Sequence, residues 1–165
     1  MGDSRDPAAD LEAIRDVAKR YSRGVDRLDP ETMKSAYWPD ATDDHGAFVG
    51  NAWEFVDHSM TAHLRWHGTM HCIFNHLVEL DGGGTSARGE IYNVTYLFRD
   101  GAIDTWFGRY LDEYQKRGDE WRILRRVCVH EGDRSDPIET PFAIASEAFR
   151  QGSFDRPSLN RPVGP

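Results

Sequence analysis

The stretch GTMHCIFNHLVELDGG, residues 68–83, decides the fold class of this chain. Its first part, from Thr69 to Leu80, has the β-rich composition of a strand, and it ends in Asp-Gly-Gly-Gly, a strong turn signal. Three more strands are expected downstream, separated by the turn dipeptides Asp-Gly and Gly-Asp, over residues 86–98, 103–117 and 121–131. The sequence therefore predicts a long antiparallel meander in the second half of the chain.

The residues before this meander have helical spacing instead. A first helix is expected from Asp10, a suitable N-cap, because apolar residues then recur at steps of three and four at Leu11, Ile14, Ala18, Tyr21 and Val25. A short helix should open at Pro30 and run to about Tyr37, followed by an extended segment over residues 41–49. Residues 51–66 again have helical spacing, with an apolar side formed by Trp53, Val56, Met60 and Leu64. Helices followed by a meander predict an α+β fold, with the helices on one face of a curved sheet.

The length of 165 residues fits one domain of ordinary size. We expect a flexible N-terminal tail over residues 1–9 and a folded domain over residues 10–135. Residues 136–165 are rich in proline and are expected to form a C-terminal segment with one short helix and an extended tail. Within it, Phe142 and Phe149 are candidates to cover a pocket.

Charge and hydropathy exclude several classes of partner. The net charge of −8 predicts an acidic surface that repels phosphate backbones, so no nucleic-acid partner is expected. No apolar run approaches the roughly 18–20 residues that span a bilayer, so no membrane partner is expected either. The polar stretch from Met1 to Asp10 lacks the apolar core of a signal peptide, and a cytoplasmic location is therefore expected. Cys72 and Cys128 form no CxxC motif and are expected to be small buried residues of the strands.

Three stretches carry a resemblance to a known family: YSRGVDRLDPETMKSAYWPDATDDHGAFVG (21–50), GTMHCIFNHLVELDGG (68–83) and GRYLDEYQKRGDEWRILRR (108–126). They resemble the SnoaL-like branch of the nuclear-transport-factor-2-like superfamily, and most of all its scytalone dehydratase and hexachlorocyclohexane dehydrochlorinase group. The resemblance implies a cone-shaped barrel, in which a curved, mostly antiparallel sheet wraps around N-terminal helices. It also implies a pocket for a small molecule and a reaction without a cofactor.

The resemblance places a catalytic pair at Asp26, in the GVD of the first helix, and His71, in the TMH of the first long strand. A histidine is suited to take a proton from an acidic C–H group, because its ordinary pKa lies near neutrality. A carboxylate on its other ring nitrogen fixes the tautomer and stabilises the imidazolium as it forms. From the residues alone, a solvated helix end and a structural strand histidine are the alternatives.

Local spacing is compatible with this pair. Asp26 lies at the edge of the apolar stripe of its helix. By the two-residue period of a strand, His71, Ile73 and Asn75 share one side, and Cys72, Phe74 and His76 share the other. A row of polar and apolar residues such as the first is typical of a pocket wall.

Further pocket residues follow if the strand parity of the family holds. Ile91, Asn93 and Thr95 would then face the pocket from the second long strand, and Trp106, Gly108 and Tyr110 from the third. The substrate-binding candidates are Tyr21, His45, Asn93 and Tyr110. Asn93 and Tyr110 are suited to bind a substrate oxygen or a developing negative charge, with a role as satisfied polar core groups as the alternative. Arg126 is expected to tie the sheet to a helix through a carboxylate.

No metal site is expected from the histidines. His63 and His67 are four residues apart, but they lack the glutamate that follows the first histidine in zinc proteases, and we place both on an exposed helix side. Asp43, Asp44 and His45 are the other cluster with metal-binding residue types.

The sequence thus predicts a cofactor-independent lyase of the dehydratase or elimination type, acting on an aromatic or hydrophobic small molecule. An isomerase, a polyketide-type cyclase or a retro-aldol lyase, for example on lignin-derived diaryl compounds, would use the same base. A non-catalytic binding or assembly module is the alternative from another class. A homodimer or homotrimer is expected, with Phe74, Tyr92 and Phe107 as apolar candidates for its interface.

Overall fold

A computed structural model describes residues 6–139, 148–149 and 154. The helices are α1 (Pro7–Asp26), α2 (Pro30–Lys34) and α3 (Ala52–Ala62), and a 3₁₀ turn, His63–Arg65, follows α3. The strands are β1 (Tyr37–Asp44), β2 (Val49–Asn51), β3 (Gly68–Leu80), β4 (Ser86–Arg99), β5 (Ala102–Arg117) and β6 (Glu120–Pro137). Phe142 and most of the short helix expected around it lie outside the described residues, and Phe149 is exposed.

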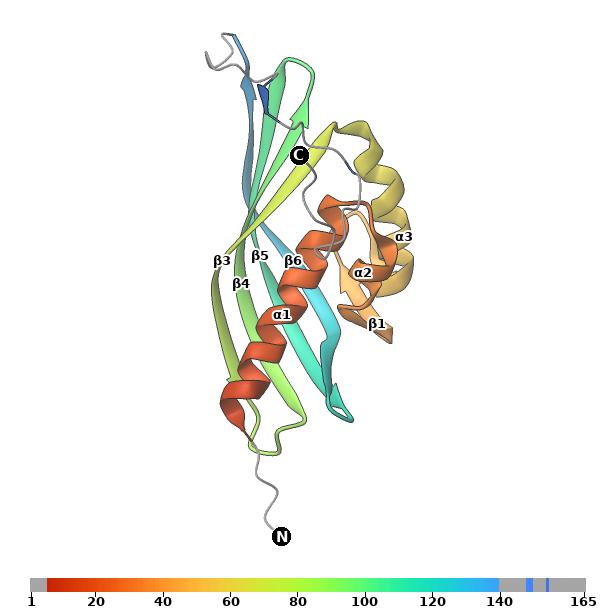
Figure 1. Ribbon diagram of the computed structural model, residues 1–165, viewed down its shortest axis with the longest axis vertical. Helices are drawn as coiled ribbons and strands as arrows, with labels where there is room; N and C mark the ends of the chain where they lie inside the picture. The colour runs from red at the N-terminus through yellow and green to blue at the C-terminus, as the bar shows by residue number, and fades with distance from the viewer. Residues whose placement is uncertain (1–5, 140–147, 150–153, 155–165) are drawn as a thin grey trace.

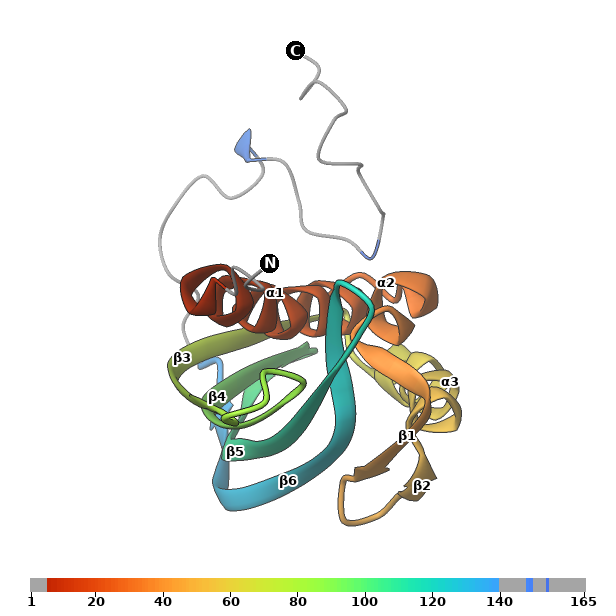
Figure 2. The same cartoon turned by 90° about the horizontal axis from the view of Figure 1, so that it is seen from below.

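The strands form one curved sheet in the order β2-β1-β6-β5-β4-β3 (Figures 1 and 2). The predicted meander is confirmed, since β3, β4, β5 and β6 pair antiparallel in chain order. β1 adds to β6 in parallel, and β2 pairs with β1. Figure 2 shows the sheet curving around α1, which confirms the α+β class with helices inside a curved sheet. In the described part of the chain this sheet stays open between β2 and β3, so it does not close into the expected barrel.

Helix α1 begins earlier than the sequence indicates. Asp6 is its N-cap and accepts hydrogen bonds from the backbone amides of Ala8 and Ala9, while Pro7 occupies the first turn. Proline suits that position because its missing N–H is not needed there. Residues 7–9 therefore belong to α1 and not to the expected N-terminal tail. Asp10 is buried within the helix instead, where its carboxylate accepts from Lys116 and from the indole of Trp121, each at 2.8 Å.

Helix α3 buries a face that is shifted from the predicted one: Val56 is fully buried as expected, and Trp53 and Met60 are partly buried against the core. Its buried residues are Ala52, Phe55, Val56 and Ser59, whereas Leu64 is largely exposed. The α-helix ends at Ala62, and the tighter 3₁₀ turn that follows changes the direction of the next side chains. This change carries Leu64 outward and, as described below, His63 inward.

A β-bulge in β3 changes which side chains face the helices. Ile73 lies opposite Asn93 and His76 lies opposite Ile91, so one extra residue is inserted between them. Beyond the bulge the alternation is reversed: Asn75 is exposed, and His76 lies 3.3 Å from the hydroxyl of Tyr114. The prediction that Asn75 shares the face of His71 and that His76 lies opposite is therefore wrong.

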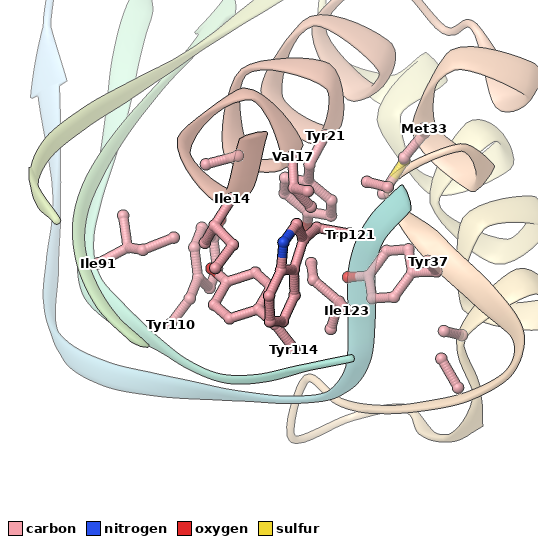
Figure 3. Close-up of a cluster of buried hydrophobic side chains, with 14 of the residues drawn as sticks. Ile14, Val17, Tyr21, Met33, Tyr37, Ile91, Tyr110, Tyr114, Trp121 and Ile123 are labelled. Carbon is pink, nitrogen blue, oxygen red and sulfur yellow. The ribbon is translucent and has the colours of Figure 1, made fainter. Parts of the chain in front are cut away.

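The hydrophobic core lies between α1 and the concave face of the sheet (Figure 3). Figure 3 shows the side chains of α1, β4, β5 and β6 converging, among them Ile14, Val17, Tyr21, Ile91, Tyr110, Tyr114, Trp121 and Ile123. No helix within the described residues is long and apolar enough to cross a membrane.

Arg126 is fully buried at the edge of this core. Its guanidinium donates to both oxygens of Asp112, each at 2.7 Å, and that aspartate lies on the neighbouring strand β5. The prediction of a helix carboxylate as its partner is wrong. Arg126 does reach the helix, but through the ring of Tyr21, whose centroid lies 4.2 Å from the guanidinium carbon.

Candidate active site

A cavity of about 220 Å³ lies between the C-terminal half of α1, α3 and the inner face of the sheet. It is lined by Tyr21, His45, Phe55, His63, Arg65, Trp66, His71, Thr95, Leu97, Trp106, Tyr110 and Cys128. Larger hollows of about 380, 470 and 450 Å³ lie elsewhere, but no histidine is among the described residues that line them. Titratable groups gathered in a concave, aromatic-lined space are the usual mark of a reactive site.

Asp26 and His71 meet at one wall of this cavity. Asp26 is the last residue of α1, and its Oδ1 lies 2.6 Å from Nδ1 of His71 on β3. The same carboxylate accepts from the backbone N–H of His71 at 2.9 Å and from the hydroxyl of Thr69 at 2.7 Å. The side chains of His71 and Asp26 are only 8% and 17% exposed.

This arrangement fixes the orientation of the His71 ring. Nδ1–H donates to the carboxylate of Asp26, so Nε2 is the nitrogen available to the cavity. A neutral imidazole held in this way can accept a proton at Nε2, and the carboxylate then stabilises the cation. The three hydrogen bonds from β3 keep the carboxylate in place while that happens.

Tyr21 and His45 lie side by side in the same cavity. The hydroxyl of Tyr21 is 3.4 Å from Nε2 of His45, and Nδ1 of His45 contacts Oδ1 of Asp43. The ring of His45 stacks on Phe55, with centroids 4.1 Å apart. Burial raises the pKa of Tyr21 well above its ordinary value, so its hydroxyl keeps its proton.

Asn93 and Tyr110 are bonded to each other. The Asn93 amide donates to the hydroxyl of Tyr110 at 2.7 Å and to the hydroxyl of Thr95 at 3.1 Å. Asn93, Thr95 and Tyr110 are all buried on the inner face, as the predicted strand parity requires. Tyr110 lines the cavity, whereas Asn93 lies outside the lining and supports Tyr110 from the neighbouring strand. Burial raises the pKa of Tyr110 well above its ordinary value.

His63 is a cavity residue that the sequence did not reveal. Its Nδ1–H donates to the carbonyl of Ser59 at 2.9 Å, and its ring centroid is 6.0 Å from that of His71. Burial lowers the pKa of His63 to about 4, so this imidazole is neutral near pH 7. The predicted exposure of His63 is wrong because the α-helix was expected to continue to residue 66. His67 is exposed, as expected.

Apolar and aromatic groups complete the walls of the cavity. The indole of Trp106 lies nearly parallel to the ring of Tyr110, with centroids 6.4 Å apart. Gly108, between them on β5, makes this possible, because a Cβ at that position would overlap the indole of Trp106. Cys128 is partly buried, and burial raises its pKa to about 12, which keeps the thiol protonated. Cys72 is also only partly buried, so neither cysteine is the fully buried residue that was expected.

Among the residues that the structure describes, no group of three or more His, Cys, Asp or Glu side chains is placed to hold a metal ion. Asp43 and His45 instead form a hydrogen-bonded pair, of which His45 lines the cavity and Asp43 is buried behind it.

Comparisons with known proteins identify the family. The model of the SnoaL-like domain matches residues 6–127. No curated protein matches the chain. One similar solved structure is a proposed scytalone dehydratase from Novosphingobium aromaticivorans, with a TM-score of 0.70 and 16% identity over 82% of this chain and 97% of that one.

Two further solved structures match this chain with similar TM-scores. A hexachlorocyclohexane dehydrochlorinase of type 2 (LinA) has a TM-score of 0.72 and 20% identity over 84% of this chain and 95% of that one. A proposed aromatic ring hydroxylase from Novosphingobium aromaticivorans has a TM-score of 0.70 and 21% identity over 79% of this chain and 96% of that one. At these identities the likeness establishes the fold, and the three different names illustrate that one fold carries several chemistries.

Proposed function

This chain belongs to the SnoaL-like domain family, and we propose that it is a lyase of the dehydratase or elimination type that needs no cofactor. The observation that supports this proposal is the contact of 2.6 Å between Nδ1 of His71 and Oδ1 of Asp26 in an aromatic-lined cavity. Two of the structural neighbours are named for eliminations, a dehydration and a dehydrochlorination.

In the proposed reaction His71 is the general base. Its Nε2 takes a proton from a carbon next to an electron-withdrawing group, and the electron pair of that bond forms the new double bond as the leaving group departs. Asp26 orients the ring and stabilises the imidazolium. Proton transfer by a positioned group of this kind typically contributes about 10²–10⁴-fold to the rate. We propose that Tyr110, whose hydroxyl accepts from Asn93, donates to an oxygen of the substrate.

The cavity favours a compact aromatic substrate. Its volume of about 220 Å³ is below the roughly 300–1,000 Å³ of typical ligand pockets, so a single ring fits better than a diaryl compound. Phe55, Trp66 and Trp106 supply apolar faces for that ring. We therefore propose a single-ring hydroxy ketone, in which the hydroxyl is β to the carbonyl, as the substrate class.

Isomerisation, cyclisation and retro-aldol cleavage would use the same base and differ in the product. A purely binding role would not need the carboxylate of Asp26 to be held by three donors from β3. We further propose that the protein works in the cytoplasm as a homodimer or homotrimer.

The test is a screen of hydroxylated aromatic ketones, with product analysis, for wild type, His71→Gln and His58→Gln. His58 is exposed on α3 and outside the cavity, so the same substitution there is a matched control. We expect dehydrated product from wild type and the control, and loss of turnover by about 10²-fold or more in His71→Gln. Equal turnover by wild type and a folded His71→Gln would overturn the proposal.

A further inference from the structure

The cavity contains a second imidazole–carboxylate pair, His45 and Asp43, and we infer that it supplies the general acid of the reaction. This inference rests on the proposed elimination and adds the residue that protonates the leaving group. The side chains of His45 and Asp43 are 18% and 0% exposed, and Nδ1 of His45 contacts Oδ1 of Asp43.

The Asp43 carboxylate is held on both oxygens. Its Oδ2 accepts from the hydroxyl of Tyr37 at 2.6 Å, and burial raises the pKa of that phenol well above its ordinary value, so Tyr37 stays a donor. The carboxylate is buried and its two oxygens are bonded to Tyr37 and to His45. It therefore stabilises a proton on His45 as Asp26 does on His71.

The His45 ring is oriented by its neighbours. Because Nδ1 faces Asp43, Nε2 faces the cavity, where it lies 3.4 Å from the hydroxyl of Tyr21. Stacking on Phe55 at 4.1 Å fixes the plane of the ring. Tyr21 also packs against the ring of His71, with centroids 6.4 Å apart, so the two imidazoles border one tyrosine.

The three histidines that line this cavity, among the described residues, differ in the partner of Nδ1. His71 and His45 each face a carboxylate, whereas His63 donates to the carbonyl of Ser59. A carbonyl stabilises an imidazolium less than a carboxylate does, and His63 is also desolvated. If His71 is the base, His45 is the cavity histidine equipped to carry the proton that the leaving group needs.

The proposed step removes one proton from carbon and delivers one proton to oxygen. The C–H proton moves to Nε2 of His71, and the C–H electron pair becomes the new carbon–carbon double bond. The C–O bond breaks, its electron pair stays on oxygen, and that oxygen takes the proton from Nε2 of His45 and leaves as water. Proton exchange with water then returns both imidazoles to their starting states, and no oxidant or reductant is needed.

The test compares two leaving groups. The substrates are the β-hydroxy ketone formed from benzaldehyde and acetone, and the matching β-chloro ketone, whose chloride leaves without a proton. Both give benzylideneacetone, which is followed by its ultraviolet absorbance above the uncatalysed background. Wild type is compared with His45→Gln, His71→Gln and the control His58→Gln, and kcat and KM are measured for each.

We expect His45→Gln to lower kcat for the hydroxy ketone by about 10²-fold or more and to change kcat for the chloro ketone only a few-fold. His71→Gln should lower kcat for both substrates. Should His45→Gln fail to fold, His45→Phe, which can keep the stacking on Phe55, replaces it.

Equal losses on both substrates in His45→Gln would overturn the acid role while leaving the base intact. Retained turnover of both substrates by His71→Gln, or no turnover by wild type, would instead overturn the proposed function. A selective loss on the chloro ketone would contradict both.

Discussion

At the scale of single residues, the chemistry of the cavity is set by what each imidazole contacts through Nδ1. Asp26 and Asp43 place a carboxylate at Nδ1 of His71 and of His45, whereas His63 donates to the carbonyl of Ser59 and is kept neutral by burial. The same side chain therefore lies in two different environments in one cavity. The difference comes from the backbone positions of its partners.

Asp26→Asn should lower kcat by about 10²–10⁴-fold without unfolding the protein. An amide in place of the carboxylate no longer stabilises the imidazolium of His71 and permits the wrong tautomer. Thr69→Val is the matched variant, because it removes one hydrogen bond to Asp26 and leaves the charge in place. It should lower kcat only a few-fold. Steady-state kinetics on the β-hydroxy ketone measures both. Full activity in Asp26→Asn would show that the two residues do not act as a unit.

His63 should make the folded state sensitive to acid. Its pKa is lowered from an ordinary value of 6.5 to about 4 by burial, so the unfolded chain binds its proton more readily than the folded one. The neutral His63 ring contributes about 3 kcal/mol to the free energy of unfolding. This contribution is complete above pH 6.5 and is lost as the pH falls toward 4.

Urea unfolding of wild type and His63→Gln across that pH range measures this effect. The free energy of unfolding should fall with decreasing pH in both proteins, because burial also lowers the pKa of His76. The fall should be less steep in His63→Gln, and the difference between the two proteins is the contribution of His63. The same pH dependence of the free energy of unfolding in both proteins would contradict the low pKa of His63.

The sequence predicted the residues of the cavity unevenly. Asp26 and His71 followed from a resemblance, since forty-odd residues separate them and helix and strand spacing only permitted their contact. Tyr110 and Thr95 followed from strand parity, which β4 and β5 keep over this stretch. His63 was missed as a cavity residue, and His45 was predicted as a substrate-binding residue without its pairing to Asp43. The former depends on where α3 ends, and the latter depends on a turn after β1.

At the scale of elements, β5 and β6 are joined beneath the cavity by the buried pair of Asp112 and Arg126. Both side chains are fully enclosed, and the guanidinium also lies over the rings of Tyr21 and Tyr110. Removing one partner of such a pair leaves an uncompensated buried charge. The contact thus fixes the strand that carries Tyr110 relative to the helix that carries Tyr21.

Asp112→Asn should destabilise the protein by about 3–5 kcal/mol for this reason. Glu113→Gln is the control on the same strand, because Glu113 pairs with Arg125 at 3.6 Å on the exposed side, where such pairs contribute about 0–1 kcal/mol. Urea unfolding at neutral pH compares the two. Similar losses of unfolding free energy in both variants would show that the buried Asp112 pair matters no more to stability than an exposed one.

Element boundaries show where local sequence signals are sufficient. Three of the four long strands were predicted to within one residue at each end, because glycine turns separate them and each pairs with the next. The fourth, β6, continues to Pro137, beyond the expected end at residue 131. The parallel pairing of β1 with β6 was not predicted, since it joins segments some eighty residues apart. The bulge at residues 74–75 was also missed, because one extra residue leaves no mark in the composition.

At the scale of the whole molecule, the outer face of the sheet exposes several large apolar side chains. Large side chains are exposed on it at Met70, Phe74, Leu77, Tyr92, Tyr96, Phe107 and Leu111. Exposed apolar patches of this kind are typical of interfaces between proteins. They include the three residues that the sequence suggested for a homo-oligomer.

Replacing Phe74 and Tyr92 together by glutamate should leave the protein monomeric, because the proposed homo-oligomer would bury both side chains. The two charges would be desolvated in the interface, which opposes association. Light scattering after size exclusion measures the mass, and Val49→Glu, exposed on β2, is the control. A wild type that is monomeric at high concentration would contradict the expected homodimer or homotrimer.

The proposed role of His71, oriented by Asp26, is to remove a proton from carbon. Benzylacetone tests it most directly, because it has the C–H groups next to a carbonyl but no leaving group, so the role of His45 does not enter. Proton NMR in heavy water would follow exchange of those hydrogens with wild type, His71→Gln and His45→Gln. Exchange should be fast with wild type and His45→Gln, and no faster than in buffer with His71→Gln. Equal exchange by wild type and His71→Gln would contradict the claim.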